Sequence, residues 1–82
     1  MISCSQYDYV EIACLYKLPL KLTLTDGSVV EGTAFDTGYD EHRQEVIILN
    51  NADVLTQIPT NTLASMTALT TNPHFNHIDF QQ

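Results

Sequence analysis

Basic side chains are scarce in this chain of 82 residues. Three Lys or Arg residues stand against ten Asp or Glu residues, which gives a formal net charge of −7. Binding to a phosphate backbone depends on clustered Lys and Arg, so direct binding of nucleic acid is not expected. The acidity suits either simple solubility or docking onto a basic partner.

Long apolar runs and cysteines are also scarce. The longest apolar run, Ile12 to Tyr16, covers five residues and is too short to span a membrane. The start of the chain lacks the basic and apolar segments of a secretion signal, so a cytoplasmic protein is expected. Cys4 and Cys14 are one pair, too few for a disulfide scaffold, and Cys14 is expected to pack as a reduced, small apolar side chain.

The remaining composition predicts one folded domain over residues 1–82. Hydrophobic residues make up 44% of the chain and charged residues 16%, which is enough for a core and unlike a disordered tail. A domain of this size buries only about 60% of the surface of its unfolded chain. Because little volume is left for a deep substrate cavity, catalysis is disfavoured. The free protein is expected to be a monomer.

Apolar periodicity predicts a helix over about residues 6–16. Ser5 is its candidate N-cap, and Lys17 suits its C-terminal end. The spacing sets Asp8 and Glu11 side by side on the solvent face. The opposite, apolar arc consists of Tyr9, Val10, Ile12, Ala13, Cys14 and Tyr16. Tyr7 lies at the edge of this arc, where its ring either completes the core or contacts a partner.

After the helix the apolar period changes to two, which is typical of strands. Strands are expected within residues 18–24, 30–34, 45–49, 54–58 and 65–69, with a hairpin turn at Asp26-Gly27. Gly32 and Ala34 indicate a bent strand or a close backbone approach. Residues 36–44 are expected to form an exposed loop, and the tail, residues 70–82, to be loosely held. This order predicts a mainly β fold with one N-terminal α-helix, an Sm-like, five-stranded, bent antiparallel barrel.

Few residues indicate catalytic or metal chemistry. His74 and His77 form an H-x-x-H pair, but Pro73 precedes them and no cluster of further ligands completes a four-ligand zinc site. The chain has no nucleophile motif and no glycine-rich phosphate loop. Carboxylates on an open helix surface, such as Asp8 and Glu11, are usually solvated anions. No metal, no cofactor and no enzymatic activity are therefore expected.

The segment from Cys4 to Cys14 carries the most specific motif of the chain. It reads C-x-x-Y-D-x-Φ-E-Φ-A-C, where Φ is an apolar residue, and it resembles the signature of the Rho-binding antiterminator family, also called Rof or YaeO. Residues 20–27 and 34–36 fall where that family has its first strand, its hairpin turn and the end of its second strand. The resemblance covers roughly residues 4–68.

This resemblance implies an inhibitor of Rho-dependent transcription termination. In that family the acidic protein binds the N-terminal RNA-binding domain of the termination factor Rho and blocks loading of the transcript. By position, the implied Rho contacts are Tyr7, Asp8 and Glu11 on the helix. A second set of implied Rho contacts lies in a loop formed by Asp40, Glu41, His42 and Arg43.

Composition and fold alone leave two alternatives open. The first is an Sm-like module that binds single-stranded RNA itself, as the expected barrel suggests. The second is an acidic adaptor domain for an unrelated protein partner, as the net charge suggests. Affinity for single-stranded RNA at low salt distinguishes the RNA-binding module from the other functions. Identification of the captured partner distinguishes the adaptor domain from a Rho inhibitor.

Overall fold

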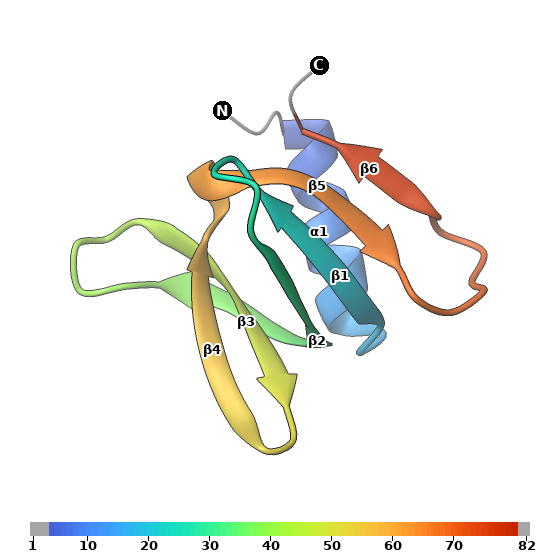
Figure 1. The fold of residues 1–82 in the computed structure, drawn as a ribbon, viewed down its shortest axis with the longest axis horizontal. Helices are drawn as coiled ribbons and strands as arrows, with labels where there is room; N and C mark the ends of the chain where they lie inside the picture. The colour runs from blue at the N-terminus through green and yellow to red at the C-terminus, as the bar shows by residue number, and fades with distance from the viewer. Residues whose placement is uncertain (1–3, 81–82) are drawn as a thin grey trace.

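A computed structural model describes residues 4–80, with side chains from Gln6 onward. Its elements in chain order are α1 (Cys4–Leu15), β1 (Pro19–Leu24), β2 (Val29–Tyr39), β3 (Glu45–Asn51), β4 (Val54–Pro59), the 3-10 turn η1 (Thr60–Thr62), β5 (Leu63–Ala68) and β6 (His77–Asp79). The strands form one bent antiparallel sheet in the order β4-β3-β2-β1-β5-β6, and α1 packs along one side of it (Figure 1).

The predicted mainly β fold with one N-terminal helix is confirmed, but the expected five-stranded barrel is wrong in two respects. The described chain has six strands, and the sheet is open, with β4 and β6 as its two edges. The turn η1 carries the chain from the β4 edge to β5. The additional strand lies in the tail, where no strand was expected.

The tail is not loosely held through residue 80. Phe75 is only 8% exposed and Phe80 only 4% exposed, so both side chains belong to the core. The ring of Phe75 meets the ring of Tyr9 edge to face, with 5.8 Å between the centroids. Strand β6 pairs with β5 through Ser65↔Asp79, Met66↔Ile78 and Thr67↔His77. The tail therefore holds α1 from the side opposite β2.

Strand β2 is longer than expected, so the loop predicted over residues 36–44 is wrong in its first part. Regular strand continues to Tyr39, and the loop is confined to residues 40–44. The register with β3 shifts from Ala34↔Leu49 to Asp36↔Ile48, which makes Phe35 the extra residue of a β-bulge. The bulge leaves both Phe35 and Asp36 on the outside, which broke the alternation that the sequence pattern relied on.

The predicted close approach at Gly32 is confirmed. A Cβ atom at this position would lie 3.2 Å from the carbonyl oxygen of Asn50 and 3.2 Å from the Cβ of Leu49. Strands β2 and β3 therefore pack too tightly here for a side chain.

The helix begins earlier and ends earlier than expected. It is helical from Cys4, so Ser5 lies within it and not at the N-cap, and it ends at Leu15. Lys17, with φ of 52°, turns the chain: its N–H donates to the carbonyl of Cys14 (3.3 Å), and the next N–H, of Leu18, donates to that of Ala13 (3.0 Å). This pair of bonds is a Schellman motif.

The core lies between the helix and the concave side of the sheet. From α1 it takes Val10, Ala13 and Cys14, whereas Tyr16 of the expected apolar arc is 55% exposed. The largest fully buried side chains from the strands are those of Leu20, Leu22, Val46, Ile47, Leu49 and Met66. Within residues 4–80, the single α-helix is too short and too polar to cross a membrane.

Candidate functional site

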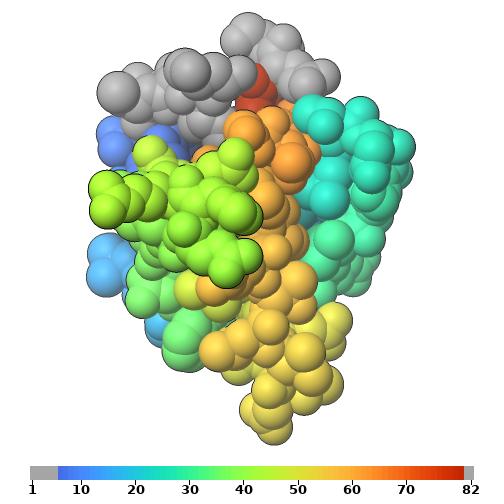
Figure 2. Space-filling view, turned by 90° about the vertical axis from the view of Figure 1, so that its left-hand side faces the viewer, coloured from blue at the N-terminus to red at the C-terminus, as the bar shows by residue number. Residues whose placement is uncertain are grey.

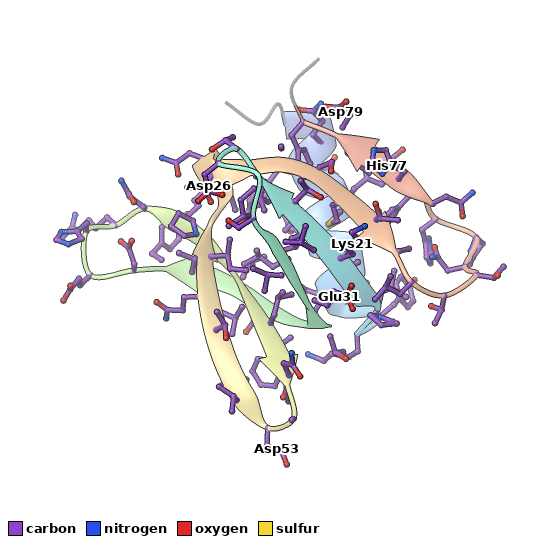
Figure 3. The ribbon with its side chains drawn as sticks, in the orientation of Figure 1. Lys21, Asp26, Glu31, Asp53, His77 and Asp79 are labelled. Carbon is purple, nitrogen blue, oxygen red and sulfur yellow. The ribbon has the colours of Figure 1, made fainter. Side chains whose placement is uncertain are left out.

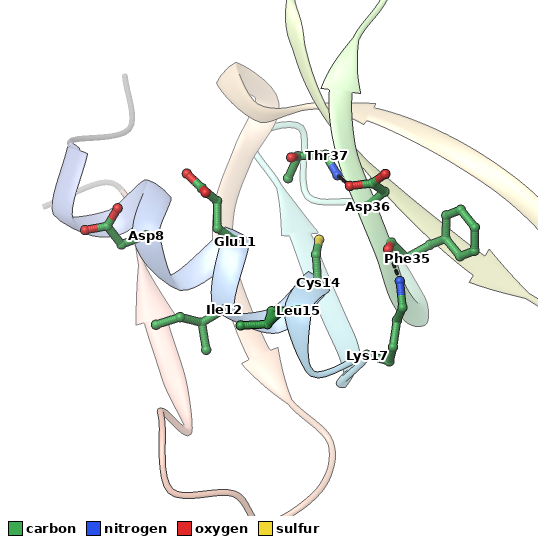
Figure 4. Close-up of a pocket in the computed structure, with 9 residues that line it drawn as sticks. All are labelled: Asp8, Glu11, Ile12, Cys14, Leu15, Lys17, Phe35, Asp36 and Thr37. Carbon is green, nitrogen blue, oxygen red and sulfur yellow. Dashed lines mark hydrogen bonds between the residues drawn. The ribbon is translucent and has the colours of Figure 1, made fainter.

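A groove of about 740 Å³ runs between α1 and β2 (Figure 4). Both implied acidic contacts, Asp8 and Glu11, are exposed and line it from the helix, as the spacing of three residues predicts. The helix side also includes Ile12, Cys14 and Leu15, and the strand side consists of Phe35, Asp36 and Thr37. Lys17 lies where the helix ends.

The groove is acidic, and Lys17, the one basic side chain that lines it among the described residues, contacts Phe35 and not a carboxylate. The Nζ of Lys17 donates to the backbone carbonyl of Phe35 and lies 4.7 Å from the centroid of that ring. Among the described residues the one contact between a basic and an acidic side chain joins His42 Nε2 to Glu41 at 3.6 Å, outside the groove, and it is an ion pair only when His42 is protonated. The carboxylates of Asp8, Glu11 and Asp36 thus face solvent without a basic partner in this part of the chain. Such an arrangement attracts cationic groups.

The pKa of the Cys14 thiol, at the floor of the groove, is raised in part by the same negative charges. The residue is 7% exposed and its thiol is free. Burial, followed by the charges of Asp36 and Glu11, raises the pKa of this thiol to about 11. The opposing effect of Lys17 is smaller than that of Asp36. At neutral pH the thiol is therefore protonated and a poor nucleophile.

Tyr7 joins the helix to the sheet. Its phenol lies close enough to the side chains of Thr37 in β2 and Glu45 in β3 for both to affect its pKa. Partial burial, together with the charges of Glu45 and Glu11, raises the pKa of this phenol. Tyr7 is only half-buried, so part of its ring remains available beside the groove.

The second set of predicted Rho contacts lies in the hairpin loop between β2 and β3. The carboxylate of Asp40 accepts the N–H of His42 (2.8 Å) and of Gln44 (3.0 Å), which fixes the turn. Glu41, His42 and Arg43 are exposed, and the hairpin projects toward the viewer in Figure 2 (yellow-green). Because the charge of Glu45 at its base affects the pKa of Tyr7, the hairpin starts close to the helix.

The structure brings Tyr7, Asp8 and Glu11 together with three residues that sequence reasoning did not single out. These are Asp36, Thr37 and Glu45. The sequence pattern predicts a loop at Asp36 and Thr37, because the bulge at Phe35 interrupts the alternation that marks a strand. Residues 34–36 match the end of the second strand in the family that the sequence resembles. That match was the one sequence feature that could have indicated Asp36.

The two histidines do not form a metal site with each other. His77 lies in strand β6 and its Nδ1 is 2.8 Å from the hydroxyl of Thr67, whereas the ring of His74 stacks on Tyr16 with 4.5 Å between centroids. From residue 4 to residue 80, no group of three or more His, Cys, Asp or Glu side chains is placed to hold a metal ion.

Comparison with known proteins identifies the family. Residues 1–80 match the family described as "Modulator of Rho-dependent transcription termination (ROF)". The fold matches a solved structure titled "YaeO bound to Magnesium from Vibrio cholerae O395", with a TM-score of 0.87 and 45% sequence identity over 93% of this chain and 99% of that one. No curated protein matches the chain. Since the family match spans nearly every residue, and the resemblance seen at Cys4–Cys14 agrees with it, the chain belongs to the family of modulators of Rho-dependent transcription termination.

Proposed function

We propose that this protein binds the N-terminal RNA-binding domain of Rho through the groove and the adjoining hairpin, and so blocks loading of the transcript. The protein then acts in the cytoplasm, where Rho meets the nascent RNA. The observation that carries the proposal is the row of carboxylates between α1 and β2, which has no cationic partner among the described residues. A cleft that binds single-stranded RNA is cationic and lined by aromatic platforms. Carboxylates can replace phosphates there, and Tyr7 can replace a base.

The required contact area extends beyond the helix. A standard interface uses about 800 Å² per partner, roughly a sixth of the 5109 Å² surface of this protein. Exposed ion pairs contribute only about 0.2–1 kcal/mol each, so apolar contacts must supply much of the binding free energy. Leu15, which is 72% exposed at the end of the groove, and Tyr39, which is 69% exposed beside the hairpin, are the available apolar side chains.

Neutralising the two helix carboxylates should weaken binding to Rho. We expect the double variant Asp8→Asn, Glu11→Gln to raise the Kd for Rho about fivefold or more, since two charge pairs are lost. The measurement is displacement of a fluorescent cytosine-rich oligonucleotide from the Rho hexamer, followed by anisotropy at low and at moderate salt.

The matched control removes two carboxylates outside the groove. Asp26→Asn, Asp53→Asn changes the net charge equally, and both residues lie at turns, as Figure 3 shows. Asparagine keeps the acceptor with which Asp26 binds the N–H of Ser28. Equal affinities of the two double variants would reject the helix as the binding face. Simultaneous binding of Rho and oligonucleotide, without mutual interference, would reject the proposed function itself.

A further inference from the structure

Each of the two walls of the groove carries a carboxylate residue that lines it. Glu11 projects from α1 and Asp36 from β2 (Figure 4). Neither forms an ion pair with a basic side chain in the described part of the chain. Lys17, which is the one basic residue among the described residues that line the groove, already contacts the carbonyl and the ring of Phe35. The space between the two carboxylates therefore has a negative potential that no ion pair within the described residues neutralises.

Asp36 is held in place before any partner arrives. The bulge at Phe35 follows the fully buried Ala34, which anchors β2 to the core. One carboxylate oxygen of Asp36 accepts the N–H of Thr37 at 2.8 Å. Because this bond restricts the side chain, little rotational freedom remains to be lost on binding.

The thiol of Cys14 is a further polar group that faces the same space, from the floor of the groove. The Sγ of Cys14 points between the helix and β2 (Figure 4). The residue is 7% exposed, and no hydrogen bond of its side chain is found within residues 4–80. The electrostatic influence of both Asp36 and Glu11 reaches this sulfur. The floor thus presents an unpartnered, weakly accepting group to whatever enters between the carboxylates.

We propose that this groove receives one arginine side chain from the RNA-binding cleft of Rho, with its guanidinium between Glu11 and Asp36. The inference rests on the proposed function and adds Asp36 as the second acidic contact. A guanidinium carries five N–H donors in a planar fork, so it can serve carboxylates on two walls at once. Its weakly hydrated faces can lie against the apolar side chains of Ile12 and Leu15, which also line the groove. An ammonium is a strongly hydrated point charge and fits this mixed lining less well.

Removal of the Asp36 charge tests the inference. We expect Asp36→Asn to raise the Kd for the Rho hexamer about tenfold, as is typical for loss of a charge-assisted hydrogen bond. Asparagine keeps the acceptor for the N–H of Thr37, so the fold should persist, and urea denaturation checks this. The matched control is Asp53→Asn at the tip of the β3–β4 hairpin (Figure 3), which should change the Kd less than about twofold. Equal effects of the two variants would overturn the inference.

Rho variants test the nature of the occupant. Each arginine of the N-terminal RNA-binding domain is changed to lysine and assayed against wild-type protein and Asp36→Asn. One arginine should lose about tenfold in affinity with the wild type and little with Asp36→Asn, because the two changes remove the same contact. If no arginine shows this coupling, the guanidinium assignment fails. If Asp8→Asn, Glu11→Gln weakens binding while Asp36→Asn does not, the inference fails and the proposed function stands. If the wild type neither binds Rho nor displaces the oligonucleotide, the proposed function fails.

Discussion

At the scale of single residues, two glycines of the same strand have opposite roles. Gly32 lies where an added Cβ would meet a backbone oxygen and a Cβ, each at 3.2 Å. Gly38 lies where the nearest atom to such a Cβ is the Cδ1 of Ile48, at 4.0 Å. Neither has a positive φ, so space alone separates them. The small residues Gly32 and Ala34 in the strand pattern predict a bend or a close backbone approach, but they do not identify the atoms that Gly32 approaches.

This difference in space predicts that alanine substitutions at Gly32 and Gly38 change the free energy of unfolding in opposite directions. Gly32→Ala should lower the free energy of unfolding by about 1–2 kcal/mol, because overpacking against β3 outweighs the entropic gain of about 0.4–1 kcal/mol. Gly38→Ala should leave stability unchanged or raise it by up to about 1 kcal/mol, since ordinary van der Waals space is available. Urea denaturation measures both. A neutral Gly32→Ala would show that β2 and β3 can separate at this point without cost.

The thiol of Cys14 predicts a loss of stability at alkaline pH. Its pKa rises from an ordinary value of 9.0 to about 11 in the folded protein, first because the side chain is buried. The unfolded chain therefore releases this proton at lower pH than the folded chain does. The resulting stabilisation is fully present below pH 9 and is lost as the pH rises to about 11.

The Cys14→Ala variant isolates this effect. Urea denaturation at several pH values should show a shallower decline between pH 9 and 11 for the variant than for the wild type. Tyr7, whose pKa is also raised, is present in both proteins and contributes equally. Parallel declines would show that the thiol titrates normally.

At the scale of elements, the sequence predicted the parts with regular periodicity and missed those stabilised by distant contacts. The helix, the alternation in β1 and the β3–β4 hairpin followed from local patterns. The tail did not, because Phe75, Ile78 and Phe80 have no common period and are ordered by packing against α1 and β5. The bulge at Phe35 likewise depends on pairing with β3. As a result the helix side of the groove was predictable, and the strand side was not.

At the scale of the whole molecule, the net charge of −7 acts mainly on the encounter with a partner. Long-range attraction accelerates association and is screened within about 8–10 Å at physiological salt, whereas closely packed contacts set the dissociation rate. The sequence alone revealed this charge. It did not reveal that three carboxylates gather at one groove, which required the fold.

The charge predicts a characteristic salt dependence of the kinetics. Raising the ionic strength from about 50 to about 300 mM should slow association with Rho about tenfold and change the dissociation rate much less. Surface plasmon resonance on immobilised Rho measures both rates. Dissociation that changes more than association would show that charge holds the formed complex together more than it guides the approach.

The short strand β6 also limits how copies of this protein can assemble. A ring or filament of identical subunits joined sheet to sheet requires a free strand at each end of the sheet. At one end of this sheet the free strand is β6, which is only three residues long and covers the outer side of β5. A neighbouring subunit can therefore reach β5 only by displacing β6, which would also expose the aromatic side chains beneath the tail.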